Sequence, residues 1–160
     1  MATPGYIVDG YNLLHCFRDL GRMMNRDPER ARGELVRRLG GFRGAKRIRV
    51  WVVFDGRGDA DELKRAGAFG VRVFFSGQMS ADHRIIQLLK QQKNPRSWTV
   101  VSSDREVQFN ARGVGAEVTG SGRFADLVTA AGPRTGGEPE KPEMRDSDIA
   151  EWEEFFRKGP

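Results

Sequence analysis

The sequence predicts one α/β domain built on a mainly parallel β-sheet of about five strands, with helices on both faces. Three observations support this fold class. Short apolar segments alternate with helix-like segments along the first 131 residues, as in sheets whose strands are joined by crossover helices. Residues 48–54 end in an almost continuously apolar run, which is typical of a strand covered on both faces. The 160 residues are enough for one hydrophobic core.

The first half of the chain supplies two strands and three helices. The apolar segment 6–8 is expected to be a short buried strand, and a turn leads from it into a helix at about 13–24. Asp27 and Pro28 suit the N-cap and the first position of a second helix. Its apolar stripe has helical spacing and consists of Ala31, Leu35, Val36, Leu39 and Phe42. The long apolar strand follows, and then a short helix at 60–67.

The second half alternates strands and helices three more times. Segments rich in β-branched and aromatic residues predict strands at 71–75, 98–101 and 116–118. Apolar residues at helical spacing predict helices at 81–92, 104–112 and 122–131. Ser80 is placed to cap the first of these helices.

The end of the chain is expected to lie outside this domain of residues 1–131. Residues 132–145 combine Gly, Pro and charge without periodicity, which indicates a linker. Residues 146–158 read as an acidic amphipathic helix, whose apolar stripe consists of Ile149, Trp152, Phe155 and Phe156. Whether that stripe docks on its own domain, on a second copy or on another protein is left open, and so is a homodimer.

Composition and charge narrow the range of functions. The net charge is +5, yet residues 138–160 hold eight acidic and four basic residues, so the rest of the chain is more basic. A basic body favours a polyanionic partner. Cys16 is the only cysteine, which excludes an intramolecular disulfide and fits a reducing compartment; its apolar neighbours predict that it is buried. Without a secretory signal or a long apolar span, the chain is expected to be cytoplasmic, with no membrane partner.

Four aspartates occupy equivalent places in the predicted fold. Asp9 and Asp55 directly follow strands, Asp104 follows the strand at 98–101, and Asp82 lies in the first turn of a helix. In a parallel sheet these positions share one edge, where ligands bind. Helical spacing places Asp82 and Asp104 on the inward, apolar faces of their helices, where a carboxylate is costly unless it is paired or binds metal. The cluster therefore predicts a site for Mg²⁺ or Mn²⁺.

Each aspartate taken alone also has a structural explanation. Asp82 and Asp104 could complement the dipole of a helix N-terminus. Asp9 and Asp55 both precede glycine and could be turn formers. Four such residues at strand ends, two of them predicted to face inward, are harder to explain by separate turns and helix caps than by one shared site.

The motifs around these aspartates resemble the NYN-domain proteins of the YacP-like ribonuclease family, a branch of the PIN-like nucleases. The resemblance begins with TyrIleValAspGlyTyrAsn at 6–12 and continues with ValValPheAspGly at 52–56. It extends through residues 70–82, which end in SerAlaAsp, and through ThrValValSerSerAspArgGlu at 99–106. The matching motifs span about residues 5–130.

The resemblance implies a three-layer α/β/α sandwich and metal-dependent cleavage of RNA. Carried over by position, Asp9, Asp82 and Asp104 would hold the metal. Asn12 would stand beside Asp9, and Asp55 would be an additional acid that supports the site. The small hydroxyl before the fourth-strand aspartate would be Ser103, which is placed with the residues expected to contact RNA.

Basic side chains supply the remaining candidate contacts to RNA. Arg57 and Arg105 each lie within two residues of a site aspartate and could hold the substrate backbone. Arg37 and Arg38 belong to a basic stretch in the second helix, which is equally well explained as a solvated helix face.

The function expected from the sequence is a metal-dependent endoribonuclease acting on single-stranded, messenger or ribosome-associated RNA. One rival is a non-catalytic RNA- or ribosome-binding module on a nuclease-like fold. A second rival, a phosphatase of the haloacid dehalogenase type, needs a second aspartate two residues after Asp9, where Tyr11 stands instead.

Overall fold

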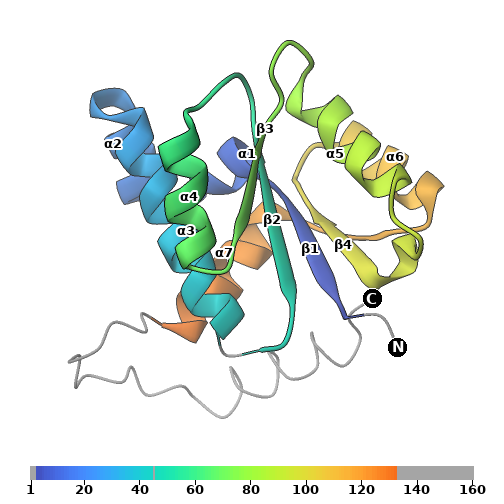
Figure 1. Cartoon of the computed structure of the whole chain (residues 1–160). Helices are drawn as coiled ribbons and strands as arrows, with labels where there is room; N and C mark the ends of the chain where they lie inside the picture. Colours follow the sequence, from blue (N-terminus) through green and yellow to red (C-terminus); the bar gives the residue numbers. More distant parts are fainter. Residues whose placement is uncertain (1–2, 45, 133–160) are drawn as a thin grey trace.

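The computed structural model describes residues 3–44 and 46–132, which form a sheet flanked by helices (Figure 1). The strands are β1 Gly5–Asp9, β2 Arg49–Phe54, β3 Arg72–Phe75, β4 Trp98–Val101 and β5 Glu117–Thr119. The helices are α1 Gly10–Leu14, α2 Arg18–Arg26, α3 Pro28–Gly44, α4 Ala60–Ala68, α5 Ala81–Lys90, α6 Arg105–Val114 and α7 Ser121–Ala131. A short 3₁₀ helix, η1 Pro95–Ser97, precedes β4.

The five described strands run parallel in the order β3-β2-β1-β4-β5. The central strand β1 pairs on both sides, so that Val8 lies opposite Val52 of β2 and Val101 of β4. The chain moves from β1 outward through β2 and β3, and then returns across the sheet to β4 and β5. The direction of winding thus reverses between β1 and β4, and such a switch point is where parallel α/β sheets bind ligands.

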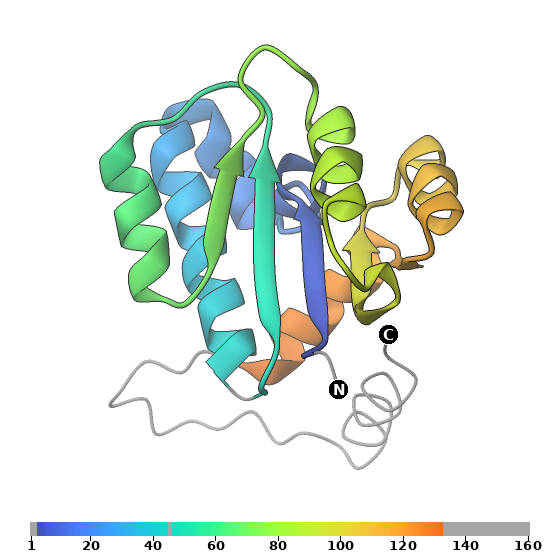
Figure 2. The same cartoon turned by 45° about the vertical axis from the view of Figure 1, so that its right-hand side comes forward.

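Helices cover both faces of the sheet, as the three-layer prediction requires (Figure 2). Successive residues of a strand point to opposite faces. On β1, Tyr6 and Val8 pack into one core with residues of α1, α2, α3, α4 and α7. Ile7 points the other way, into a second core with residues of α5 and α6. The predicted α/β/α architecture is confirmed.

The helix predicted at about 13–24 is in fact two helices. The N–H groups of Cys16 and Phe17 donate to carbonyls only three residues back, which tightens and ends α1. Phe17 then has extended backbone (φ −101°, ψ 117°) and is buried. This break turns Cys16 outward, so the prediction that Cys16 is buried is wrong.

The start signals read from the sequence are confirmed at two helices. Asp27 Oδ1 accepts a hydrogen bond from Arg30 N at the start of α3, and Ser80 Oγ accepts one from His83 N at the start of α5. Apart from Gly132, the predicted linker and the predicted C-terminal helix lie outside the described residues. Of the helices in the described part, none combines the length and apolar composition that a bilayer span requires.

Candidate metal centre

The carboxyl ends of the strands lie at the upper edge of the sheet in Figure 2, and the four predicted aspartates stand at these strand ends or at the start of the helices that follow. Asp9 is the last residue of β1, and Asp55 directly follows β2. Asp82 lies in the first turn of α5, and Asp104 is the N-cap of α6. The structure brings these side chains close enough together that the charges of Asp55, Asp82 and Asp104 all raise the pKa of Asp9. Asp9 and Asp104 lie on the two sides of the switch point.

Asp9 is the most buried of the four aspartates, with 9% of its surface exposed. Burial raises the pKa of its carboxyl group to about 6. A hydrogen bond from Ser102 lowers this pKa, whereas the charges of Asp82, Asp55 and Asp104 raise it further. Near neutral pH the ionised carboxylate of Asp9 is therefore destabilised by its burial and by the neighbouring aspartates.

Gly10 lets helix α1 begin directly against the neighbouring strand. A Cβ atom at this position would lie 2.4 Å from the ring of Phe54 and 2.9 Å from the carbonyl oxygen of Val53. No side chain fits there without displacing the end of β2. The close packing holds Asp9 and the first turn of α1 at the edge of the sheet.

Asp82 is half-buried, and the pKa of its carboxyl group is raised. The causes are burial first, and then the charges of Asp104, Asp55 and Glu106. Within the described part of the chain its carboxylate has no hydrogen-bond or ion-pair partner. A half-buried, unpaired carboxylate among like charges is a poor structural element and a good ligand for a cation.

Asp104 does not have the inward orientation predicted for it. The side chain is exposed, and its Oδ1 accepts hydrogen bonds from the backbone N–H groups of Glu106 (2.8 Å) and Val107 (3.4 Å). The prediction treated Asp104 as a residue of the first helical turn. As the N-cap it has extended backbone (φ −74°, ψ 119°), and its side chain folds over the end of the helix. Asp104 therefore caps α6 and also contributes a negative charge to the site.

Asp55 connects two of the loops that form the site. The side chain is exposed, and its Oδ1 accepts a hydrogen bond of 2.7 Å from the backbone N–H of Ala81. Since Ala81 precedes Asp82, this bond fixes the start of α5 relative to the end of β2. Asp55 thus positions another acid and adds negative charge to the edge.

Ser102, which sequence reasoning missed, joins two of the aspartates. The side chain is fully buried. Its hydroxyl donates to Asp9 Oδ2 (2.9 Å) and accepts a hydrogen bond from the backbone N–H of Asp104 (3.1 Å). A serine at the end of an apolar strand, two residues before an aspartate, was the available signal; its partner on β1 was not visible because 93 positions separate them.

Asn12 and two serines fasten the far side of the site. Asn12 Oδ1 accepts hydrogen bonds from the backbone N–H of Ser103 (2.9 Å) and from the hydroxyl of Ser121. The hydroxyl of Ser103 in turn accepts from the backbone N–H of Ser121 (3.1 Å). Asn12 therefore ties α1 to the start of α6 and to α7. Ser121, at the start of α7, is a further residue that the sequence did not indicate.

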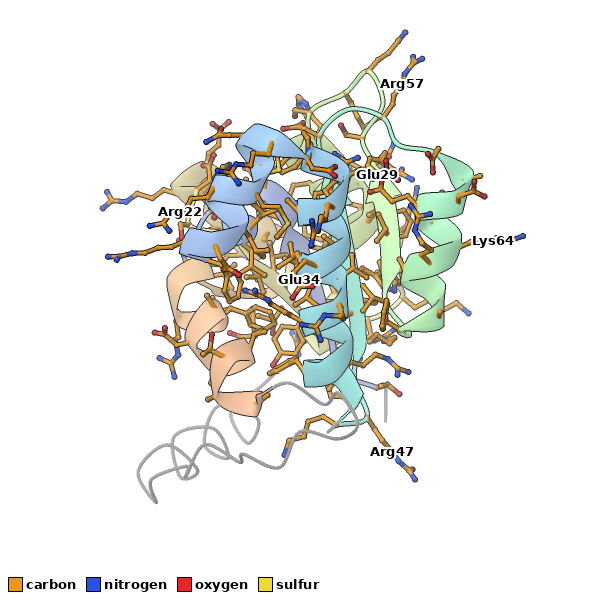
Figure 3. All side chains as sticks on the ribbon, turned by 90° about the vertical axis from the view of Figure 1, so that its left-hand side faces the viewer. Arg22, Glu29, Glu34, Arg47, Arg57 and Lys64 are labelled. Carbon is orange, nitrogen blue, oxygen red and sulfur yellow. The ribbon has the colours of Figure 1, made fainter. Side chains whose placement is uncertain are left out.

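The predicted RNA-binding arginines separate into two groups. Arg57 is exposed and projects from the loop between β2 and α4, at the end of the molecule where the strands finish (Figure 3). Arg105 is exposed at the start of α6. Arg37 and Arg38 lie on α3 and bind carboxylates: Arg37 binds Glu34, and Arg38 binds Glu34 and Asp19. The structure does not bring these two to the aspartates.

A second acidic group lies away from the edge site. Within the described residues, carboxylate oxygens of Glu29, Asp59 and Glu62 lie within 4.8 Å of one another. Each of the three has a structural role. Glu62 forms a bidentate ion pair with Arg32, and Glu29 pairs with Arg65. Asp59 accepts the Glu62 N–H as the N-cap of α4. These interactions account for the group without a metal.

The donor set at the sheet edge fits a hydrated divalent cation. No three of the four aspartates come within 4.8 Å of one another as the Glu29 group does, so their present positions do not suit one ion in direct contact with three of them. Mg²⁺ retains several of its waters and usually binds through one or two carboxylates. The mutual repulsion of the aspartates, and the lack of a described partner for the Asp82 carboxylate, also favour a cation.

A parallel sheet between two helical layers, with acids at its switch point, defines a nuclease-like α/β domain. The family model of the YacP-like NYN domain matches residues 6–151, and the chain belongs to that family. The crystal structure of Rae1 (YacP) from Bacillus subtilis is similar, with a TM-score of 0.65, 25% identity, and coverage of 82% of this chain and 75% of that one. Its W164L mutant gives a TM-score of 0.66 and 26% identity, covering 79% and 75%. No curated protein sequence matches.

Proposed function

We propose that this chain is a metal-dependent endoribonuclease that hydrolyses phosphodiester bonds of RNA. The metal, Mg²⁺ or Mn²⁺, would be held by Asp9, Asp82 and Asp104, in part through the waters that such an ion retains. The observation that supports this most is the electrostatic coupling of the aspartates at the switch point, where burial and like charges raise the pKa of Asp9 to about 6. A cation removes the repulsion that this arrangement otherwise suffers.

The residues of the site have different tasks in this proposal. Asp9 provides a buried carboxylate whose orientation is set by Ser102. Asp82 provides an oxygen donor that has no hydrogen-bond or ion-pair partner among the described residues. Asp55 and Asn12 position the acids through the start of α5 and the loop after β4. A divalent cation bound here supplies an activated water and stabilises negative charge on the phosphate.

RNA is the proposed substrate, as single strands or on a ribosome. Arg57 and Arg105 are exposed, follow site aspartates in the chain by two residues and one residue, and would hold the phosphate backbone; Ser103 lies at the same edge. Arg37 and Arg38 would take a lesser part, because Glu34 and Asp19 already neutralise them. A cytoplasmic location and a catalytic domain that ends near residue 131 complete the proposal.

The test is cleavage of a labelled single-stranded RNA by the purified chain in Mn²⁺ and in EDTA. We expect internal cuts in Mn²⁺ and none in EDTA. Asp82→Asn removes a metal ligand without removing a hydrogen bond, and it should reduce the rate at least about a hundredfold. The matched control is Asp126→Asn, an exposed aspartate on α7, which should cut like the unaltered chain.

The same assay addresses the non-catalytic alternative. An unaltered chain that binds RNA and leaves it intact in both Mg²⁺ and Mn²⁺ would favour a binding module on a nuclease-like fold. Cleavage that persists undiminished in Asp82→Asn would remove the aspartate edge from the mechanism.

A further inference from the structure

Helix α6 presents an aromatic side chain almost entirely to solvent. Phe109 is 75% exposed, compared with 44% for Phe69, 41% for Leu63 and 39% for Met79, the other exposed large hydrophobic residues of the described chain. One exposed apolar residue is ordinary on a protein surface. The residues beside Phe109 are what indicate a binding surface.

Two arginines flank Phe109 on the same stripe of the helix. Arg105 lies four residues before it and Arg112 three residues after it, a spacing that places all three side by side. All three are exposed, whereas Val107 and Ala111 on the opposite face are buried. α6 therefore shows solvent a basic and aromatic stripe, composed of Arg105, Phe109 and Arg112.

Among the residues that the structure describes, no carboxylate neutralises the guanidinium groups of this stripe. Within residues 3–44 and 46–132, neither Arg105 nor Arg112 takes part in an ion pair, unlike Arg37 and Arg38 on α3. Glu106 is the acid next to Arg105, but it lies roughly 100° around the helix from it. Both positive charges are thus available to a partner.

The stripe starts at the proposed metal centre. α6 begins immediately after its N-cap Asp104, and five residues of helix place Phe109 about 7.5 Å further along the axis. Figure 1 shows α6 at the outer side of the molecule, beyond α5. An RNA strand bound at the proposed metal centre would therefore be able to extend onto α6.

We propose that Arg105, Phe109 and Arg112 bind single-stranded RNA that extends from the cleavage site. An unpaired base stacks on the Phe109 ring, and the two arginines hold the adjacent phosphates. Stacking on an aromatic side chain needs no particular base and requires bases that are free of a duplex. This inference rests on the proposed function and adds to it a surface, beyond the metal centre, that binds the unpaired strand.

The stripe suits RNA better than a protein partner. Its apolar part is a single ring, whereas a stable protein interface buries about 800 Å² on each side around an apolar core. Two arginines that have no ion-pair partner in the described structure, beside one aromatic ring, complement a base with its phosphates.

The experiment measures binding of the full chain in EDTA, where cutting is prevented, to a fluorescent single-stranded oligouridine and to a duplex RNA of equal length. We expect Phe109→Ala and Phe109→Leu to weaken single-strand binding at least about fivefold, and Phe109→Trp to preserve it. Duplex binding should change little in all three variants. Leu63→Ala, an exposed apolar residue on α4, is the matched control and should bind like the unaltered chain.

Salt dependence gives a second reading of the same surface. Arg105→Ala and Arg112→Ala should each reduce the slope of log affinity against log salt by roughly 0.7, the value for one phosphate contact on a single strand. Unchanged binding by Phe109→Ala, or equal losses on single-stranded and duplex RNA, would overturn the stacking proposal. Failure of the proposed function shows separately, in the Mn²⁺ cleavage assay: an unaltered chain that cuts no RNA there would refute it, whereas cutting together with unchanged binding by Phe109→Ala would refute the stacking alone.

Discussion

Replacing Asp9 by asparagine is expected to stabilise the metal-free protein at pH 7 by roughly 2–3 kcal/mol. Burial and the neighbouring acids raise the pKa of Asp9 from 3.8 to about 6. Between these values the folded state holds a proton that the unfolded state has released. The stability of the unaltered chain therefore falls as the pH rises from about 4 to about 6, and it stays low above that range. Asparagine carries no charge at any of these pH values, so the stability of Asp9→Asn should not fall over this range.

Urea unfolding in EDTA at pH 4 and at pH 7 measures this effect. The difference in unfolding free energy between Asp9→Asn and the unaltered chain should be small at pH 4 and large at pH 7. Adding Mn²⁺ at pH 7 should stabilise the unaltered chain more than it stabilises Asp9→Asn. Parallel pH profiles for the two proteins would show that Asp9 is not the strained carboxylate described above.

Replacing Ser102 by alanine should reduce both stability and RNA cleavage. The Ser102 hydroxyl satisfies Asp9 Oδ2 and the N–H of Asp104, and its loss leaves buried polar groups without partners. We expect a cost of about 1–3 kcal/mol in unfolding free energy. The pKa of Asp9 should also rise further, because the hydrogen bond from Ser102 lowers it. Since Asp9 would lose its orientation, cleavage should fall about 10- to 100-fold.

The control for Ser102→Ala comes from β4, the strand that Ser102 directly follows. Thr99 on β4 is buried, and its hydroxyl has no hydrogen-bond partner among the described residues. Thr99→Val should therefore be neutral or stabilising, with cleavage unchanged. If both variants lost stability equally, the effect would belong to strand packing and not to the hydrogen bonds of Ser102.

The order of the strands and helices could be predicted because each has a local signal. The apolar run at 48–54 predicted a strand that is covered on both faces of the sheet. Asp27 and Ser80 predicted helix starts that the structure confirms. The break between α1 and α2 had no such signal. Leu13, Leu14 and Leu20 are buried on both sides of it, so their spacing fits one continuous helix. Packing of Phe17 into the core determines the break, and packing of this kind is not visible in local sequence.

The members of the site were easier to predict than its geometry. The aspartates could be found because they follow strands, and parallel strands end at a common edge. Helical phase gave the wrong exposure for Asp104, since an N-cap residue lies outside the helical repeat. Ser102 and Ser121 were missed because their hydrogen-bond partners are 93 and 109 positions away. Such contacts arise only once the switch point brings β1 and β4 together.

Calorimetric titration of Mn²⁺ into the metal-free chain at pH 7 tests the proposed centre most directly. Two acidic groups in the described part of the chain provide matched variants: Asp9→Asn and Asp82→Asn at the sheet edge, and Asp59→Asn in the group with Glu29 and Glu62. We predict that the unaltered chain and Asp59→Asn bind Mn²⁺ alike, whereas both edge variants lose at least about tenfold in affinity. Binding that survives in Asp9→Asn and Asp82→Asn but disappears in Asp59→Asn would contradict the assignment of the metal to the sheet edge.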